Sequence, residues 1–258
     1  MKPGELSTSE LESVRQRFAV ASDVYDEANP ASKPLPGGWR RVFSSAQVSG
    51  LGDHGFDGAL YTRTVNGRDQ HIFAFRGMDG WKDLDDVARL ALGKSPAQLK
   101  DAYKFVKIAA EKFGVDPSQA EYVGHSMGGY LSKAIGLLHR SPEIFAFNSP
   151  GLFRDDLKGL PQKIQEEFGE TKSDITLNQI ERSVTSINSK FDIVTWVGDI
   201  SGNTIKVSTR GRQHQLSSLQ DSFNRAVEAV EIQRPVTVAA NTARSSILGL
   251  GGGVFAPA

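Results

Sequence analysis

The feature that most constrains the fold of this chain is the run Gly-His-Ser-Met-Gly-Gly at residues 124–129. Residues 121–123 before it have the composition of a short strand, and residues 127–139 after it are small and apolar at helical spacing. The glycines lack side chains that would clash in a sharp turn between a strand and a helix. Such a turn holds a serine hydroxyl clear of the sheet. We therefore predict that Ser126 is a nucleophile; a glycine-rich helix start with an incidental serine is the alternative interpretation.

Strand and helix signals alternate along the rest of the chain. Asn66-Gly67 separates two runs of strand-forming residues, which predicts a hairpin. Strands are predicted at 59–65, 71–75, 121–123, 144–147, 183–187, 194–197 and 204–207, with the last two as a candidate pair. Helices are predicted at 8–28, 97–113, 127–139 and 216–232. This order favours an α/β fold with a mostly parallel sheet and helices on both faces.

The length of 258 residues suits a single domain, which we place at residues 1–235. Its amino-terminal helix spans about 8–28, and residues 236–258 form a tail of small residues. Residues 79–94 are a candidate lid because they combine apolar and acidic side chains; an ordinary surface helix explains the same pattern. Residues 151–180 are more polar and are a candidate cap insertion, which competes for the role of lid.

The composition of the chain excludes several classes of function. Thirty basic and thirty acidic residues cancel, so the chain has no general electrostatic reason to bind nucleic acid or an anionic membrane, although this balance does not exclude a local basic patch. The absence of cysteine excludes thiolate metal sites and cysteine nucleophiles, and we expect neither a metal nor a cofactor. No run approaches about 18 apolar residues, so we expect no transmembrane helix. The amino terminus lacks the apolar core of a Sec signal, which predicts a cytoplasmic protein or one secreted by a non-Sec route.

Two histidines, His139 and His214, follow Ser126 in the chain. A serine nucleophile needs a histidine base and an acid that orients it, in the order serine, acid, histidine. His139 lies on the helix that leaves the turn, roughly 20 Å along its axis, so His214 is the predicted base. Asp192 follows a predicted strand at its carboxyl end and is the predicted acid, with Asp199 as the alternative.

Two backbone amides are needed to bind the negative charge that develops on a substrate oxygen. Met127, the residue after the nucleophile, supplies one, and Met78 supplies the other because Gly77 lets the chain turn after an early strand. An ordinary strand-end turn is the alternative for this pair. We also expect Gly77, Trp81 and His125 to contact the substrate.

Four segments of the chain resemble, in their order, the segments of the class 3 lipases. They are Phe75-Arg76-Gly77-Met78 with the following Trp81-Lys82-Asp83-Leu84, the run at 124–129, the acid segment at 188–194 and His214-Gln215-Leu216. The resemblance implies an α/β-hydrolase fold, metal-free hydrolysis of acyl esters and lipid substrates; some bacterial members are exported phospholipases of the A1 type. Met78 departs from the threonine or serine usual in the family, and the tryptophan and aspartate after it are transposed.

Motif and resemblance together predict a serine ester hydrolase that acts on lipids, a lipase or a phospholipase A1, with transient contact to lipid surfaces. An acyltransferase or thioesterase that uses the same residues is the second hypothesis. A non-catalytic binding protein on a hydrolase scaffold is the third. The distance from Ser126 to His214 discriminates this third hypothesis from the first two.

Overall fold

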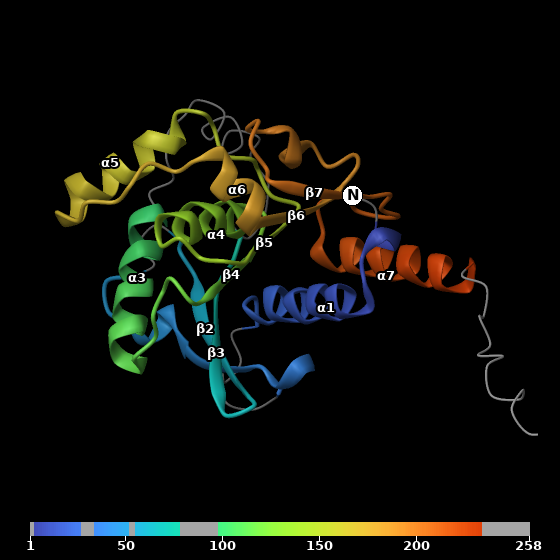
Figure 1. Cartoon of the computed structure of the whole chain (residues 1–258), viewed down its shortest axis with the longest axis horizontal. Coiled ribbons are helices and arrows are strands. Elements are labelled where there is room, and N and C mark those ends of the chain that lie inside the picture. Colours follow the sequence, from blue (N-terminus) through green and yellow to red (C-terminus); the bar gives the residue numbers. More distant parts are fainter. Residues whose placement is uncertain (1–2, 27–33, 52–54, 78–97, 234–258) are drawn as a thin grey trace, which may run out of the picture.

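The computed structural model describes residues 3–26, 34–51, 55–77 and 98–233. In these residues seven strands form one sheet, and their order across the sheet follows their order in the sequence (Figure 1). The strands are β1 Arg40–Ser44, β2 Gly58–Val65, β3 Arg68–Phe75, β4 Glu121–His125, β5 Ile144–Phe147, β6 Val184–Ser189 and β7 Asn203–Val207. The first three are antiparallel neighbours, and β3 to β7 run parallel. The prediction of a mostly parallel sheet is confirmed.

Helices cover both faces of this sheet (Figure 1). One face carries α3 (Gln98–Phe113), α4 (Met127–Leu138), α5 (Asp156–Phe168) and α6 (Leu177–Ser183), and the other carries α1 (Thr8–Asp23) and α7 (Leu216–Gln233). Right-handed crossovers between strands that follow one another across a sheet place their helices on the same face. The opposite face is therefore left for the helices at the two ends of the described chain.

Side chains that alternate between the two faces of the sheet produce two hydrophobic cores, one on each face. In β3, Phe73 and Phe75 belong to the cluster under α3 and α4, whereas Ile72 and Ala74 belong to the cluster under α1 and α7. Successive side chains of a strand point to opposite faces of the sheet, so one strand contributes to both cores. All four side chains are fully buried, as a sheet covered on both faces requires.

The hairpin between β2 and β3 forms at the predicted residues. Asn66 and Gly67 have φ values of 52° and 73°, and Val65 pairs with Arg68 across them. Two consecutive positive φ values are the conformation of a type I′ turn, whose twist matches that of the strands it joins. The predicted hairpin is therefore confirmed, and its turn is the two residues Asn66 and Gly67.

Residues 194–197 do not form the predicted strand. Most of them belong to the short 3-10 helix η4 (Ile193–Trp196). Asp192 caps this helix, since its side chain accepts a hydrogen bond of 3.1 Å from the Val194 amide. The predicted partner strand does form as β7, but it pairs in parallel with β6. The capping aspartate explains why an apolar, β-branched run turns into a helix here.

Helix α1 ends at Asp23, short of the predicted residue 28. The candidate lid at 79–94 and the tail at 236–258 lie outside the described residues. Among the helices that the structure describes, none is both long and apolar enough to cross a bilayer.

Residues 151–180 contain α5 and the start of α6. The end of α5 is joined to α3 by polar contacts, in which Lys100 Nζ lies 2.5 Å from Glu167 and Tyr103 Oη lies 2.5 Å from Glu170. These contacts attach the segment to the helical layer on one face of the sheet. Its role as a cap over a substrate stays a prediction.

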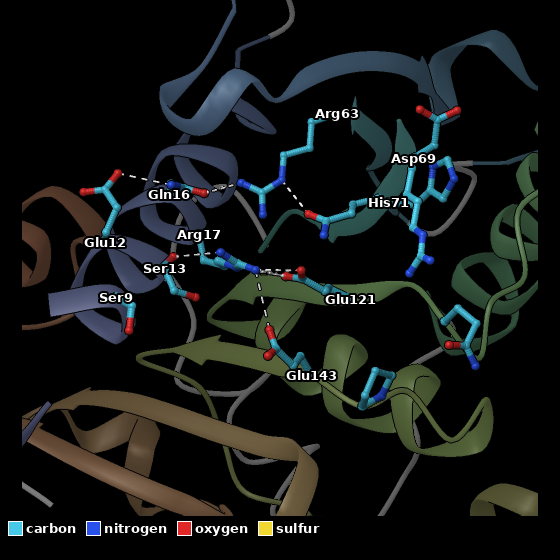
Figure 2. Close-up of a pocket in the computed structure, with 14 residues that line it drawn as sticks. Ser9, Glu12, Ser13, Gln16, Arg17, Arg63, Asp69, His71, Glu121 and Glu143 are labelled. Atoms are coloured by element: carbon cyan, nitrogen blue, oxygen red, sulfur yellow. Dashed lines mark hydrogen bonds and ion pairs between the residues drawn. The ribbon is translucent and has the colours of Figure 1, made fainter. Parts of the chain in front are cut away.

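Helix α1 is attached to the sheet by a buried ion pair (Figure 2). Arg17 donates to the Glu121 carboxylate through Nε at 2.8 Å and through Nη2 at 2.6 Å. The pair lines a cavity of about 660 Å³ that Arg63 and Glu143 also line. Because Glu121 begins β4 and Ser126 follows its last residue, this cavity lies at the sheet edge opposite Ser126.

Candidate active site

Ser126 occupies the sharp turn between β4 and α4. Its φ of 58° and ψ of −127° are backbone angles that a residue with a side chain rarely adopts. Glycines are required around it, because a Cβ on Gly124 would lie 2.2 Å from the Gly128 oxygen, and a Cβ on Gly128 would lie 2.0 Å from the Phe75 oxygen. The run at 124–129 therefore holds the serine in a strained strand–helix turn at the carboxyl edge of the sheet.

Ser126, His214 and Asp192 form one hydrogen-bonded chain. His214 Nε2 lies 2.9 Å from Ser126 Oγ, and His214 Nδ1 lies 2.7 Å from Asp192 Oδ2. Asp192 is only 2% exposed, and a carboxylate at that depth needs hydrogen-bond donors, which His214 and the Val194 amide supply. With the Nδ1 proton donated to the carboxylate, Nε2 is the ring nitrogen left to accept the serine proton.

A second set of hydrogen bonds holds the backbone at His214. His125 Nε2 donates to the His214 carbonyl oxygen at 2.8 Å, and His125 Nδ1 lies 2.8 Å from Tyr25 Oη. Tyr25 Oη also accepts a 3.0 Å hydrogen bond from the Gly77 amide. Because a carbonyl oxygen only accepts, the His125 proton is on Nε2, and Nδ1 accepts from the tyrosine hydroxyl. This set joins the end of α1, the loop after β3, the serine turn and the histidine loop.

The charge states of Tyr25 and His125 agree with these directions. Burial, and then the neighbouring His214 imidazole, lowers the pKa of His125 to about 3. Burial raises the pKa of Tyr25 to about 12. At neutral pH the His125 ring is therefore uncharged and the Tyr25 hydroxyl keeps its proton, so both groups can donate and accept as the distances require.

Asn148 links the acid segment to the base segment. It is fully buried and has a φ of 42°. Its Nδ2 donates to the Gln213 carbonyl oxygen at 2.9 Å, and its Oδ1 accepts from the Ser189 amide at 2.7 Å. Gln213 immediately precedes His214, and Ser189 ends β6 shortly before Asp192. One amide side chain thus spans the two loops that carry the partners of the serine.

The structure describes some of the residues predicted to bind the oxyanion or the substrate, and others lie outside the described residues. Met78 and Trp81 lie outside the described residues. Met127 is the first residue of α4, where backbone amides have no partner within the helix. Gly77 packs against the turn, since a Cβ there would lie 2.9 Å from Ser126 Cβ. His125 adjoins the serine, but both of its ring nitrogens are already bound within the protein.

The alternative acid and the second histidine have other partners. Asp199 is exposed and pairs with Arg154 at 3.3 Å. His139 stacks on Tyr103, with 5.2 Å between the ring centroids. Within the ranges that the structure describes, no group of three or more histidine, aspartate or glutamate side chains is placed to hold a metal ion.

Tyr25 and Asn148 are members of the site that are not among the residues predicted from the sequence. Asn148 had an available signal, because it directly follows the apolar run at 144–147 and the carboxyl ends of parallel strands are where functional groups gather. Tyr25 has no such signal, because it continues the apolar periodicity of the first helix, which is typical of a core residue.

A serine on a strained strand–helix turn, hydrogen-bonded to a histidine and an acid from later loops of a mostly parallel sheet, defines an α/β-hydrolase. That is the class of this chain, and it agrees with the prediction. Residues 16–242 match the phospholipase-like family described as the Tle-like phospholipase domain. The match spans most of the chain, which therefore belongs to this lipase-like family of α/β-hydrolases. No curated protein matches the chain.

Several solved structures are similar to the chain at low identity. A triacylglycerol lipase from Penicillium expansum is 14% identical, with a TM-score of 0.46 over 84% of this chain and 90% of the lipase. Carboxyl esterase 2 from Tuber melanosporum is 14% identical, with a TM-score of 0.39 over 81% of this chain and 87% of the esterase. The carboxylesterase EstE1, cloned from a metagenomic library, is 15% identical, with a TM-score of 0.36 over 88% and 98%. Because these identities are low, family membership rests on the family match.

Proposed function

We propose that this protein hydrolyses carboxylic esters of lipids through a covalent acyl-enzyme on Ser126. The observation that carries the proposal is the hydrogen-bonded chain from Ser126 through His214 to the buried Asp192. A serine hydroxyl is a weak nucleophile at neutral pH and becomes effective when an oriented imidazole removes its proton. The tautomer that the buried carboxylate selects in His214 is the one that this proton transfer needs.

In the acylation step, Ser126 Oγ attacks the ester carbonyl carbon while His214 Nε2 takes the serine proton. The carbonyl electron pair moves to oxygen, and the amides of Met127 and Met78 donate to it. When the tetrahedral centre collapses, the bond to the alcohol oxygen breaks and His214 returns the proton to the leaving alcohol. Asp192 stabilises the transient imidazolium. Water then repeats the sequence at the acyl-enzyme and releases the fatty acid.

We assign His125 a positioning role in this scheme, because its ring is held between Tyr25 and the His214 carbonyl oxygen. Gly77 lets the loop after β3 pack against the serine turn, because a Cβ at this position would lie 2.9 Å from Ser126 Cβ. Trp81 would contact the acyl chain. In this scheme, hydrogen bonds through Tyr25 and His125 connect the histidine loop with the loop after β3.

We propose a phospholipid as the substrate, cleaved at the position 1 ester. The description of the family as phospholipase-like supports a phospholipid, and the four ordered segments that resemble class 3 lipases support an acyl ester. Incubation with phospholipids that carry different acyl chains at positions 1 and 2, followed by mass analysis of the products, tests this choice. Release of the position 2 acid, or activity on short soluble esters alone, would exclude the A1 type.

The catalytic proposal is tested with Ser126→Ala and a matched control, Ser132→Ala. Ser132 is also a buried serine, on the helix α4 that follows Ser126, and its hydroxyl donates to the Gly128 oxygen at 2.8 Å. We expect Ser126→Ala to lower kcat on a soluble ester at least about a thousandfold, because alanine has no hydroxyl with which to form the acyl-enzyme. Ser132→Ala should retain kcat near that of the parent.

Two other results would redirect the proposal. If added alcohols capture the acyl group much faster than water does, the protein is an acyltransferase on the same residues. If the parent and Ser126→Ala release fatty acid equally slowly from every ester, the chain is a binding protein on a hydrolase scaffold. Intact-protein mass spectrometry after a brief exposure to substrate reports the acyl-enzyme directly.

A further inference from the structure

Three large apolar side chains are exposed close together in the acid segment. Phe191 is 68% exposed, Ile193 is 51% exposed and Trp196 is 69% exposed. They are the most exposed large hydrophobic side chains in the described part of the chain; the others are isolated positions on separate elements, namely Val42, Val65, Phe113 and Leu177. Single exposed apolar side chains are ordinary, whereas a cluster marks a surface that contacts something. Phe191, Ile193 and Trp196 are called the apolar cluster below.

The apolar cluster adjoins the candidate active site through the backbone. Phe191 and Ile193 flank Asp192, the buried carboxylate that holds His214. Trp196 ends η4, the short helix that the same aspartate caps. A surface that covers the cluster therefore meets the sheet edge at which Ser126 lies.

Exposed basic side chains gather at the same edge of the sheet. They are Lys190 after β6, Lys206 near the end of β7, and Arg210 and Arg212 in the loop that follows β7. None of these four, called the basic set below, has an ion-pair partner among the described residues, and the exposed acid Asp199 is paired with Arg154. This edge therefore carries four exposed basic side chains, although the whole chain is neutral.

We propose that the apolar cluster and the basic set dock this protein on bilayers that contain anionic phospholipid, with the Ser126 edge toward the lipid. Tryptophan and phenylalanine favour the boundary between lipid headgroups and acyl chains, and basic side chains near the surface are attracted by anionic headgroups. The inference rests on the proposed function, since it places a lipid hydrolase on its substrate. It adds which residues make the contact and which lipid charge they prefer.

The first test measures binding in the absence of hydrolysis. The full chain carrying Ser126→Ala is sedimented with vesicles of phosphatidylcholine alone or of phosphatidylcholine mixed with phosphatidylglycerol. We expect tighter partitioning onto the mixed vesicles, and a loss of this preference as salt is raised, because salt screens charges at an exposed surface. Equal partitioning onto the two compositions overturns the electrostatic half of the proposal.

The second test separates the apolar cluster from the basic set. In the Ser126→Ala background, the triple substitution Phe191→Ser, Ile193→Ser and Trp196→Ser should weaken partitioning at least about tenfold. Leu177→Ser, at a position that is 48% exposed on α6, is the matched control and should have no effect. Circular dichroism and thermal melting check that each variant is folded. Unchanged partitioning of the folded triple variant overturns the docking surface.

The basic set has its own matched pair of variants. Lys206→Gln with Arg210→Gln should reduce partitioning onto the mixed vesicles by about fivefold for each charge removed. Arg40→Gln with Arg182→Gln removes two exposed charges from β1 and α6 and should leave partitioning unchanged. Equal losses in the two pairs would show a general charge effect and would overturn the assignment to this edge.

Trp196 reports on what covers the cluster. Its emission, taken as the difference between the parent and Trp196→Phe, should shift to the blue when mixed vesicles are added. If Trp196 is already shielded from acrylamide without lipid, another part of the chain or a second copy covers it, and sedimentation equilibrium tells these apart. Either result overturns docking on lipid.

Failure of this inference is distinguishable from failure of the proposed function. Loss of vesicle binding in the triple variant says nothing of the serine chemistry, which is read on a soluble ester with the parent protein. Binding by Ser126→Ala through the apolar cluster, with no hydrolysis of any ester by the parent, would retain the docking surface and remove the enzyme.

Discussion

At the residue scale, single side chains of this site hold two segments at once. Asp192 binds His214 through one carboxylate oxygen and the Val194 amide through the other. Tyr25 accepts from the Gly77 amide and donates to His125. A substitution at such a residue changes the relative position of two loops, which is a different effect from removal of a reacting group.

Tyr25→Phe tests the positioning role. Without the hydroxyl, the Gly77 amide and His125 Nδ1 lose their partner, and a buried polar group left unpaired costs about 1–3 kcal/mol of stability. We expect kcat on a soluble ester to fall about tenfold with a smaller change in KM, because misplaced loops affect alignment in the transition state more than binding. Steady-state kinetics and urea unfolding measure the two effects.

Tyr61→Phe is the matched control for this prediction. Tyr61 is fully buried, whereas Tyr25 is partly buried, and the Tyr61 hydroxyl donates to Asp23 at 2.7 Å without a bond to the serine turn or its loops. Its loss should lower stability while kcat stays near that of the parent. An equal fall of kcat in the two variants would mean that general destabilisation, and not positioning, explains Tyr25.

Lys133 gives a prediction on pH. This side chain is fully buried in α4 and donates to the Pro150 carbonyl oxygen. Burial lowers its pKa from 10.5 to about 7. Between these two pH values the unfolded chain holds a proton that the folded chain lacks, so stability rises with pH across this window. The contribution is at most about 1.4 kcal/mol per pH unit.

The measurement is urea unfolding between pH 7 and pH 10 for the parent, Lys133→Met and the exposed control Lys158→Met. The free energy of unfolding of the parent should rise relative to that of Lys133→Met as pH increases, because methionine does not titrate. The curves of the parent and Lys158→Met should run parallel. Parallel curves for all three proteins would contradict the lowered pKa.

At the element scale, helix α1 depends on the ion pair between Arg17 and Glu121. Burial raises the pKa of Glu121 in spite of the arginine beside it, so desolvation of the carboxylate outweighs the attraction. The pair fixes where α1 lies, and the end of α1 carries Tyr25 to the site. The helix and the sheet are therefore connected at both edges of the sheet.

Arg17→Met should destabilise the protein by about 3–5 kcal/mol, because it leaves the Glu121 carboxylate buried without its partner. The double substitution Arg17→Met with Glu121→Leu should recover much of this loss, since neither charge then remains. Lys100→Met, which breaks the exposed contact to Glu167, should change stability little. Chemical denaturation measures the free energy of unfolding of each variant. A double variant as unstable as Arg17→Met would refute this account.

At the scale of the whole molecule, the sequence predicts the parts that have local signals. The hairpin at Asn66-Gly67 and the turn at Ser126 depend on residues next to each other in the chain, and both form as predicted. His214 could be selected because only two histidines follow the serine. The parallel sheet follows from the alternation of strands and helices.

The parts that the sequence does not predict depend on distant contacts. Strand β1 lacks a clear alternation and exists because it pairs with β2. Residues 194–197 have strand composition, but the Asp192 cap turns them into η4. Tyr25 reaches its histidine across a sequence separation of 100 residues. No local pattern records such a contact.

That long-range contact has a practical consequence for studies of assembly. Tyr25 lies before the hairpin tip at Asn66-Gly67, whereas Ser126, Asp192 and His214 lie after it. Two fragments divided at this tip would separate the supporting tyrosine from the three reacting groups. Turnover of a chromogenic ester on mixing the fragments would then serve as a real-time reporter of their recombination, with the first fragment acting as a titratable activator of the second.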